Sequence, residues 1–88
     1  MTYMIIETFK SGKVREIYQR LEEKGRMQPK GLTYINSWID ENMQKCYQVM
    51  ETDSVEKIHQ WISNWDDLME IEIVPVISSA EAKKRALS

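Results

Sequence analysis

The sequence has one cysteine, one histidine and no long apolar run. Because Cys46 has no partner for a disulfide within the chain, a reducing compartment is favoured. A lone histidine cannot complete a zinc set, and the acidic residues of 66–72 lack the spacing of a calcium loop. No stretch approaches the ~20 apolar residues of a membrane span, and residues 1–7 lack the basic start of a signal peptide. We therefore expect a cytoplasmic protein with no metal site, no other cofactor and no membrane contact.

An excess of charge of one sign is also missing. Twelve basic and fourteen acidic residues give a net charge of −2, without a basic stripe, so nucleic acid is not an expected partner. The 88 residues fit a single domain, 1–88. Because a domain of this size buries only roughly 60–65% of its unfolded surface, it gains much from an oligomer interface.

Hydrophobic periodicity changes in a regular order along the chain. Alternation predicts strands at 2–9, 31–40, 43–51 and 68–78, and helical spacing predicts helices at 13–26 and 54–66. The order βαββαβ indicates an α+β, ferredoxin-like sandwich with an antiparallel sheet of order 4-1-3-2 and helices on one face. Proline at position 75 agrees, because it requires an edge strand. A capping box at Ser78 and Glu81 predicts a short C-terminal helix from about 79 to 85.

Local signals refine these elements. Ser11 and Asp53 are the expected N-caps of the two main helices, and Gly25 is the expected C-terminal end of the first. Strict alternation in the second strand predicts one face made of the following residues: Leu32, Tyr34, Asn36 and Trp38.

Several strands are apolar on both faces, for example Met4 and Ile6 against Ile5 and Phe9. A two-layer monomer would leave one such face in water, and a patch of that kind marks an interaction surface. We expect a homodimer that packs sheet on sheet through the open face. The alternative is that tall side chains at the ends of the sheet are only partly exposed.

Short characteristic segments are spread over nearly the whole chain. They are Gly25-Arg26-Met27 with Pro29 and Gly31-Leu32, Ser37-Trp38, residues 46–51, Trp61, residues 65–68 and residues 74–77. On these segments the chain resembles a family of short bacterial proteins of unknown function, and its element order and two-sided sheet resemble the dimeric α+β barrel superfamily. That superfamily includes cofactor-free monooxygenases, haem-degrading enzymes, decarboxylases and ligand-binding regulatory domains, so the resemblance implies a fold rather than one chemistry.

The superfamily's pockets generally lie between sheet and helices, which directs attention to Glu7 in the first strand. A carboxylate held among Tyr3, Ile5 and Phe9 would have a raised pKa and could act as a general base. Tyr47 is the second candidate catalytic residue, as a group that orients a substrate. The alternative for Glu7 is an ion pair with Lys45 or Arg26, or contact with solvent at the end of the sheet.

Four further residues are candidates for binding a ligand. Trp38 with Asn36, and Trp65 on the second helix, could form walls of a pocket for a planar molecule. Trp65 with Trp61 also suits a structural core. His59 is a candidate because haem-degrading members of the superfamily use a helix histidine, although a lone helix histidine is more often a surface residue.

Two classes of function follow from these residues. The first is an uncharacterised homodimeric domain that binds a small hydrophobic or aromatic molecule or acts as an interaction module. The second is a cofactor-independent oxygenase or isomerase with Glu7 as base. The loop from Arg26 to Lys30 could also attract a small anion, or it could serve only as solubilising charge near a helix end.

Overall fold

Four strands form one antiparallel sheet in the computed structural model, which describes residues 1–88. The strands are β1 (Thr2–Phe9), β2 (Thr33–Ile39), β3 (Lys45–Glu51) and β4 (Met69–Val76), and the helices are α1 (Val14–Lys24), α2 (Val55–Ile62) and α3 (Ser79–Ala86). The sheet order is β2-β3-β1-β4, which is the predicted order 4-1-3-2 read from the other edge. The α+β, ferredoxin-like βαββαβ architecture is confirmed, and Pro75 lies in an edge strand as expected.

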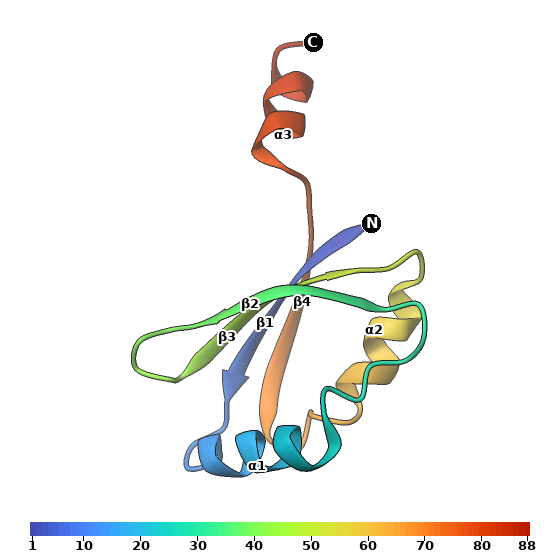
Figure 1. Ribbon diagram of the computed structural model, residues 1–88. Helices are drawn as coiled ribbons and strands as arrows, with labels where there is room; N and C mark the ends of the chain where they lie inside the picture. The colour runs from blue at the N-terminus through green and yellow to red at the C-terminus, as the bar shows by residue number, and fades with distance from the viewer.

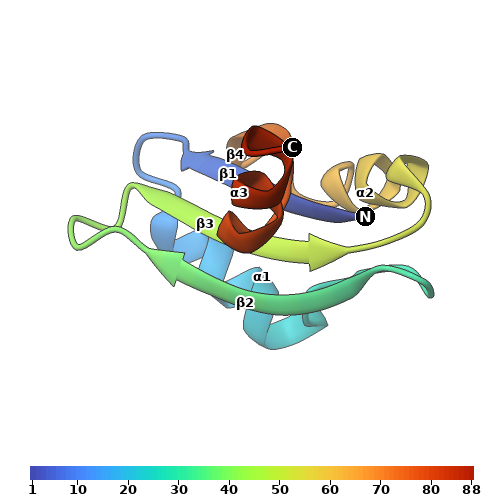
Figure 2. The ribbon, with the colours of Figure 1, turned by 90° about the horizontal axis from the view of Figure 1, so that it is seen from above.

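Helices α1 and α2 lie on one side of the sheet, and α3 stands on the other (Figures 1 and 2). In β1, Ile5 and Glu7 are buried on the helix side, whereas Met4 and Ile6 alternate to the opposite face, which we call the open face. Ile17 of α1 and Ile58 of α2 pack into the same core.

The main helices begin later than their sequence signals predict. Residues 10–13 form a turn in which the Lys13 N–H donates to the Lys10 carbonyl at 3.1 Å. Helix α1 therefore begins after Lys13 rather than after Ser11. Ser54, not Asp53, precedes α2. Helix α2 also ends at Ile62, before the predicted end, because the next residues form tighter i→i+3 turns such as Trp65 N–H to Ile62 O at 2.8 Å.

A β-bulge at Ile35 overturns the predicted face of β2. Tyr34 pairs with Met50, but the register shifts so that Asn36 pairs with Val49 and Trp38 pairs with Tyr47. The extra residue inverts the alternation, because side chains alternate with a period of two. Tyr34 is therefore on the helix side, whereas Asn36 and Trp38 are on the open face.

The core is small for the length of the chain. Thirteen of the 88 residues are buried, and nine apolar ones form the central cluster. Trp61 and Trp65 belong to it, which confirms their expected structural role. Trp65 keeps its place although α2 has ended, because the turn after the helix carries it back over the sheet.

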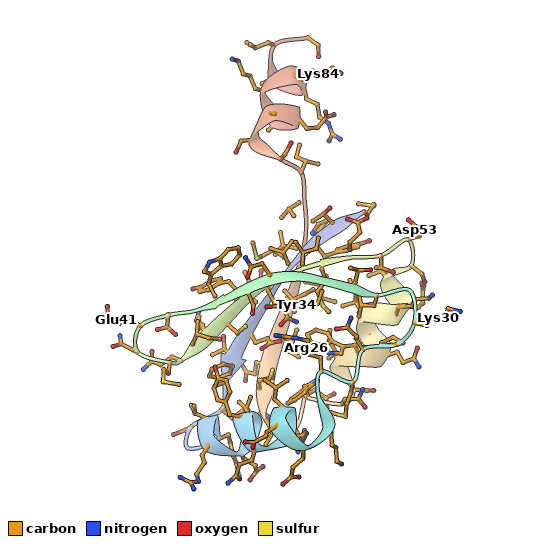
Figure 3. All side chains as sticks on the ribbon, in the orientation of Figure 1. Arg26, Lys30, Tyr34, Glu41, Asp53 and Lys84 are labelled. Carbon is orange, nitrogen blue, oxygen red and sulfur yellow. The ribbon has the colours of Figure 1, made fainter.

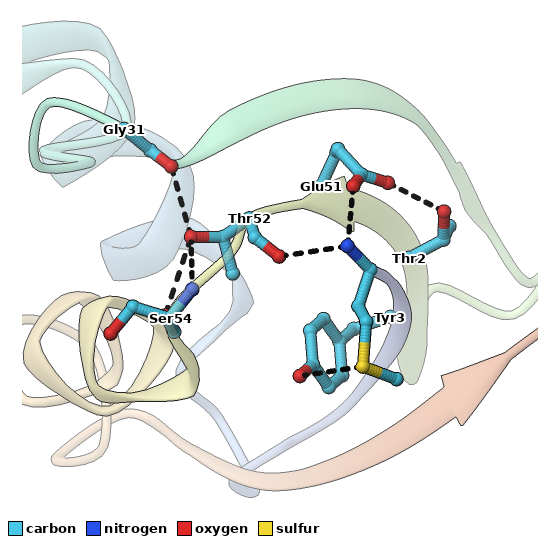
Figure 4. A network of polar contacts seen from close by, with 7 residues as sticks. Thr2, Tyr3, Gly31, Glu51, Thr52 and Ser54 are labelled. Carbon is cyan, nitrogen blue, oxygen red and sulfur yellow. Dashed lines mark hydrogen bonds and ion pairs between the residues drawn. The ribbon is translucent and has the colours of Figure 1, made fainter.

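The N-terminus is fixed to the end of β3 (Figure 4). The Met1 ammonium donates to Glu51 Oε1 at 2.7 Å and to the Thr52 carbonyl at 3.0 Å. The buried Thr52 hydroxyl donates to the Gly31 carbonyl at 2.9 Å and accepts from the Ser54 N–H at 3.2 Å. These bonds join β1, the loop before β2 and the start of α2.

Helix α3 forms where the capping box predicts it, with Ser78 Oγ accepting from the Glu81 N–H. It stands away from the rest of the chain (Figure 1), and none of its residues is buried. The radius of gyration is 14.3 Å, against about 12 Å for a globular domain of this length. None of the three helices combines the length and the hydrophobicity of a membrane-spanning segment.

Candidate functional site

A cavity of about 270 Å³ lies between α1 and the helix side of the sheet. Nine of its thirteen lining residues are hydrophobic. The full lining consists of Glu7, Phe9, Ile17, Tyr18, Leu21, Arg26, Ser37, Ile39, Cys46, Gln48, Trp61, Trp65 and Met69. A concave, mostly apolar site with a few polar groups is typical of small-molecule binding, and this one is slightly smaller than the usual range of about 300–1,000 Å³.

The strands bring two polar side chains, Glu7 and Gln48, and the thiol of Cys46 together on the floor of the cavity. Glu7 of β1 pairs in register with Cys46 of β3, and Gln48 follows Cys46 on the same face. All three are buried, at 6%, 5% and 2% exposure. Burying a polar group costs free energy unless it is hydrogen-bonded, and no fully buried side-chain N or O atom lacks a partner.

Burial sets the protonation of this cluster. Desolvation raises the pKa of Glu7 from its ordinary 4.5 to about 7, although the nearby Cys46 thiol and the Arg26 guanidinium lower it in part. Burial, with the charge of Glu7, raises the pKa of Cys46 to about 12, so the thiol is inert as a nucleophile. Of the two alternatives for Glu7, the structure favours the buried carboxyl with a raised pKa, because the side chain forms no ion pair.

Arg26 brings a positive charge to the cavity from the loop after α1. Its guanidinium lies over the Tyr34 ring, 3.6 Å from the centroid, and Nη1 donates to Gln48 Oε1 at 2.9 Å. Its carbonyl accepts from the indole N–H groups of Trp61 and Trp65 at 2.8 and 3.1 Å. Figure 3 shows Arg26 beside Tyr34 between sheet and helix, whereas Lys30 lies at the outer end of the loop. The loop cations therefore do not act as one cluster.

The structure separates the residues predicted from the sequence. Glu7 and Trp65 line the cavity. Tyr47 and Trp38 are cross-strand neighbours on the open face, and Asn36 is on the same face. His59 is exposed on α2, away from the cavity. The cavity therefore unites Glu7 with none of Asn36, Tyr47 and His59, although their functional roles stay predictions.

Sequence reasoning missed Gln48 as a neighbour of Glu7, and it named Arg26 only as one alternative ion-pair partner. A signal was present for Gln48, which occupies an inward position of β3 between the buried residues Cys46 and Met50. The position of Arg26 beside Tyr34 and Gln48 had no local signal, because it depends on hydrogen bonds from Trp61 and Trp65 far along the chain. No group of three or more His, Cys, Asp or Glu side chains converges as a metal site.

Comparisons with known proteins extend the fold assignment. None of the functionally curated proteins matches the chain. It is similar to the crystal structure of protein Atu4242 from Agrobacterium tumefaciens, with a TM-score of 0.55 and 16% identity over 90% of this chain and 96% of that one. It is also similar to SCO4226 from Streptomyces coelicolor A3(2), with a TM-score of 0.51 and 16% identity over 89% of this chain and 100% of that one. At this identity the likeness shows the fold alone. Residues 1–87 match the sequence model of a domain of unknown function, DUF3303, and the chain belongs to that family.

Proposed function

We propose that this protein is a small-molecule-binding domain whose ligand, a hydrophobic or aromatic molecule, occupies the cavity under the sheet. The observation that carries the proposal is the cavity itself, which holds a buried carboxyl and a guanidinium within mostly apolar walls. Trp61 and Trp65 form the inner wall there, at 2% and 4% exposure, and their indole N–H groups are already bonded to the Arg26 carbonyl. Flat apolar walls with fixed polar groups favour a planar ring.

A thermal-shift screen with small ring compounds tests this proposal. A ligand at ten times its Kd stabilises the folded state by about 1.4 kcal/mol, which raises the Tm of a domain this size by several degrees. Leu21→Trp places an indole in the cavity and should abolish the shift. Gln19→Trp, which adds the same bulk to an exposed position of α1, is the matched control and should keep it.

We further propose that the domain works as a homodimer through the open face. That face carries exposed Trp38 and Tyr47, at 55% and 37% exposure, beside the half-buried Met4, Ile6 and Val49. With only thirteen buried residues, the domain has much to gain from covering this surface. A second copy is the natural partner, because a sheet-on-sheet interface is self-complementary.

The position and charge of helix α3 also favour association with a second copy of the chain. It stands beyond the open face, and an eight-residue helix alone is marginal in water. Ile77 and Leu87 at its two ends are 47% and 77% exposed. Helix α3 holds three of the twelve basic residues of the chain and one of its fourteen acidic residues. The helix is therefore basic, and the rest of the chain is acidic. This charge complementarity favours docking of α3 on a second copy.

Analytical ultracentrifugation tests the dimer. Trp38→Glu puts a charge into the proposed interface and should shift the chain toward monomer. Met43→Glu changes a similarly exposed apolar residue in the hairpin turn and should leave association unchanged. A wild-type chain that stays monomeric at high micromolar concentration would refute the dimer.

A cofactor-independent isomerase or oxygenase is a second candidate function, favoured by one observation. Glu7 faces the cavity with a pKa of about 7, near the optimum for a general base at neutral pH. Because Tyr47 is on the open face, Arg26 or Gln48 would orient the substrate. NMR can follow solvent-deuterium exchange at the carbon next to the carbonyl of phenylacetone. Faster exchange with wild type than with Glu7→Gln supports catalysis, and equal exchange refutes it.

A further inference from the structure

Arg26 is a cation in the cavity without a carboxylate partner. The ion pairs of the chain join Met1–Glu51, Lys13–Glu16, Arg20–Asp67 and Arg85–Glu81, and Arg26 is in none of them. Of the five N–H groups of a guanidinium, one is engaged, by Gln48 Oε1 at 2.9 Å. The remaining donors are therefore available to a ligand.

The guanidinium is also held in place before any ligand binds. Tyr34 packs against its face, and the Tyr34 hydroxyl is itself fixed by Ser37 Oγ at 2.7 Å. Trp61 and Trp65 fix the backbone of Arg26 through its carbonyl. A planar guanidinium whose backbone and side chain are already fixed binds carboxylates at little entropic cost. Its paired N–H groups match the two carboxylate oxygens.

We propose that the cavity binds a small aromatic or alicyclic monocarboxylate. The ligand's carboxylate pairs with Arg26, and its ring lies against Trp61 and Trp65. Binding of the ligand is accompanied by binding of one proton to Glu7. This inference rests on the proposed function and names its ligand class. The apolar walls accept the ring, whereas the two indole N–H groups offer it nothing because they are already bonded.

The charged and titratable groups around Glu7 explain why a proton accompanies the ligand. Arg26 from the loop, Cys46 from β3 and Tyr18 from α1 face it, and β4 contributes the uncharged Ile71. An ionised Glu7 would repel an incoming carboxylate in a low-dielectric site, whereas a protonated Glu7 can donate a hydrogen bond to it. The anion therefore favours the protonated form of Glu7.

Isothermal titration calorimetry tests the ligand class. The probes are benzoate, phenylacetate and cyclohexanecarboxylate, each compared with its neutral amide, against wild type, Arg26→Gln, Arg26→Lys and Lys24→Gln. The acids should bind wild type about ten- to a hundredfold more tightly than their amides, and Arg26→Gln should remove that preference. Arg26→Lys keeps the charge but loses the paired donors, so it should bind the acids more weakly than wild type. Lys24→Gln removes an exposed positive charge nearby and should behave like wild type.

Titrations in buffers of different ionisation enthalpy measure the proton. At pH 8 nearly one proton should be taken up per bound acid, and at pH 6 only about a tenth of one, because Glu7 is then already mostly protonated while the free probes are still ionised. Equal binding of acids and amides would overturn this inference but leave the apolar ligand site of the proposed function intact. Absence of binding by every probe would overturn the inference and also count against the proposed function. Acid binding that survives in Arg26→Gln would overturn the inference alone.

Discussion

The most informative perturbation is Glu7→Gln, because it removes the titration of one buried carboxyl at nearly constant shape. The folded protein holds the Glu7 proton up to a pKa of about 7, whereas the unfolded chain releases it near 4.5. Below pH 4.5 both states are protonated, and the group contributes no pH dependence. Between 4.5 and 7 the folded state binds more protons than the unfolded state, so stability falls as pH rises. Above pH 7 both states are ionised and the loss is complete.

The magnitude follows from the same pair of values. A pKa raised from 4.5 to about 7 corresponds to about 3 kcal/mol of stability lost between pH 4 and pH 8. Because Glu7 is only 6% exposed, solvent screens little of this effect. Glu7→Gln should therefore match wild type near pH 4 and exceed its free energy of unfolding by about 3 kcal/mol at pH 8.

Urea denaturation of both proteins from pH 4 to pH 9 measures the difference directly. The other carboxyls titrate alike in both proteins, so their contributions cancel in the difference curve. Glu70→Gln, which changes an exposed carboxylate of β4, is the control and should give a flat curve. A flat curve for Glu7→Gln as well would show that Glu7 titrates normally, and the reasoning on the cavity would fail.

Three further perturbations test other parts of the structure. Thr52→Val should cost about 1 kcal/mol in urea denaturation, because it leaves the part-buried Gly31 carbonyl and Ser54 N–H without their partner. Thr33→Val at an exposed position should change little. Removal of residues 78–88 should weaken dimerisation at least about tenfold in ultracentrifugation, yet leave the fold intact by circular dichroism, because hydrogen bonds of α3 stay within 78–88. Unchanged association would contradict the docking of α3. Met43→Asn should stabilise the fold by up to about 1 kcal/mol. Met43 has a φ of 57° in the hairpin turn, and asparagine adopts this left-handed conformation more readily than methionine. A lower Tm for the variant would contradict this.

The architecture could be predicted from the sequence because its signals are local and repeated. Alternation in β1 and β3, helical spacing around Ile17 and Ile58, and Pro75 in the last strand all pointed to one topology. Glu7 could also be identified, because alternation in a central strand places its carboxylate on the same buried face as Ile5 and Phe9.

The remaining errors came from single residues and from distant contacts. The bulge at Ile35 inserts one residue, and one residue suffices to exchange the faces of Tyr34 and Trp38. The contacts of Arg26 with Tyr34 and Gln48 could not be predicted, because its position depends on hydrogen bonds from Trp61 and Trp65, which are 35 and 39 residues away. Periodicity carries no information on such contacts.

The most direct test of the ligand site is a ¹³C NMR titration of the Glu7 side-chain carboxyl, with and without saturating phenylacetate. The free protein should show Glu7 titrating near pH 7, and the bound protein should show it titrating at higher pH, because the ligand anion stabilises the protonated form. A carboxyl that titrates near 4.5 in both samples would contradict the account of a buried acid and of its role in binding.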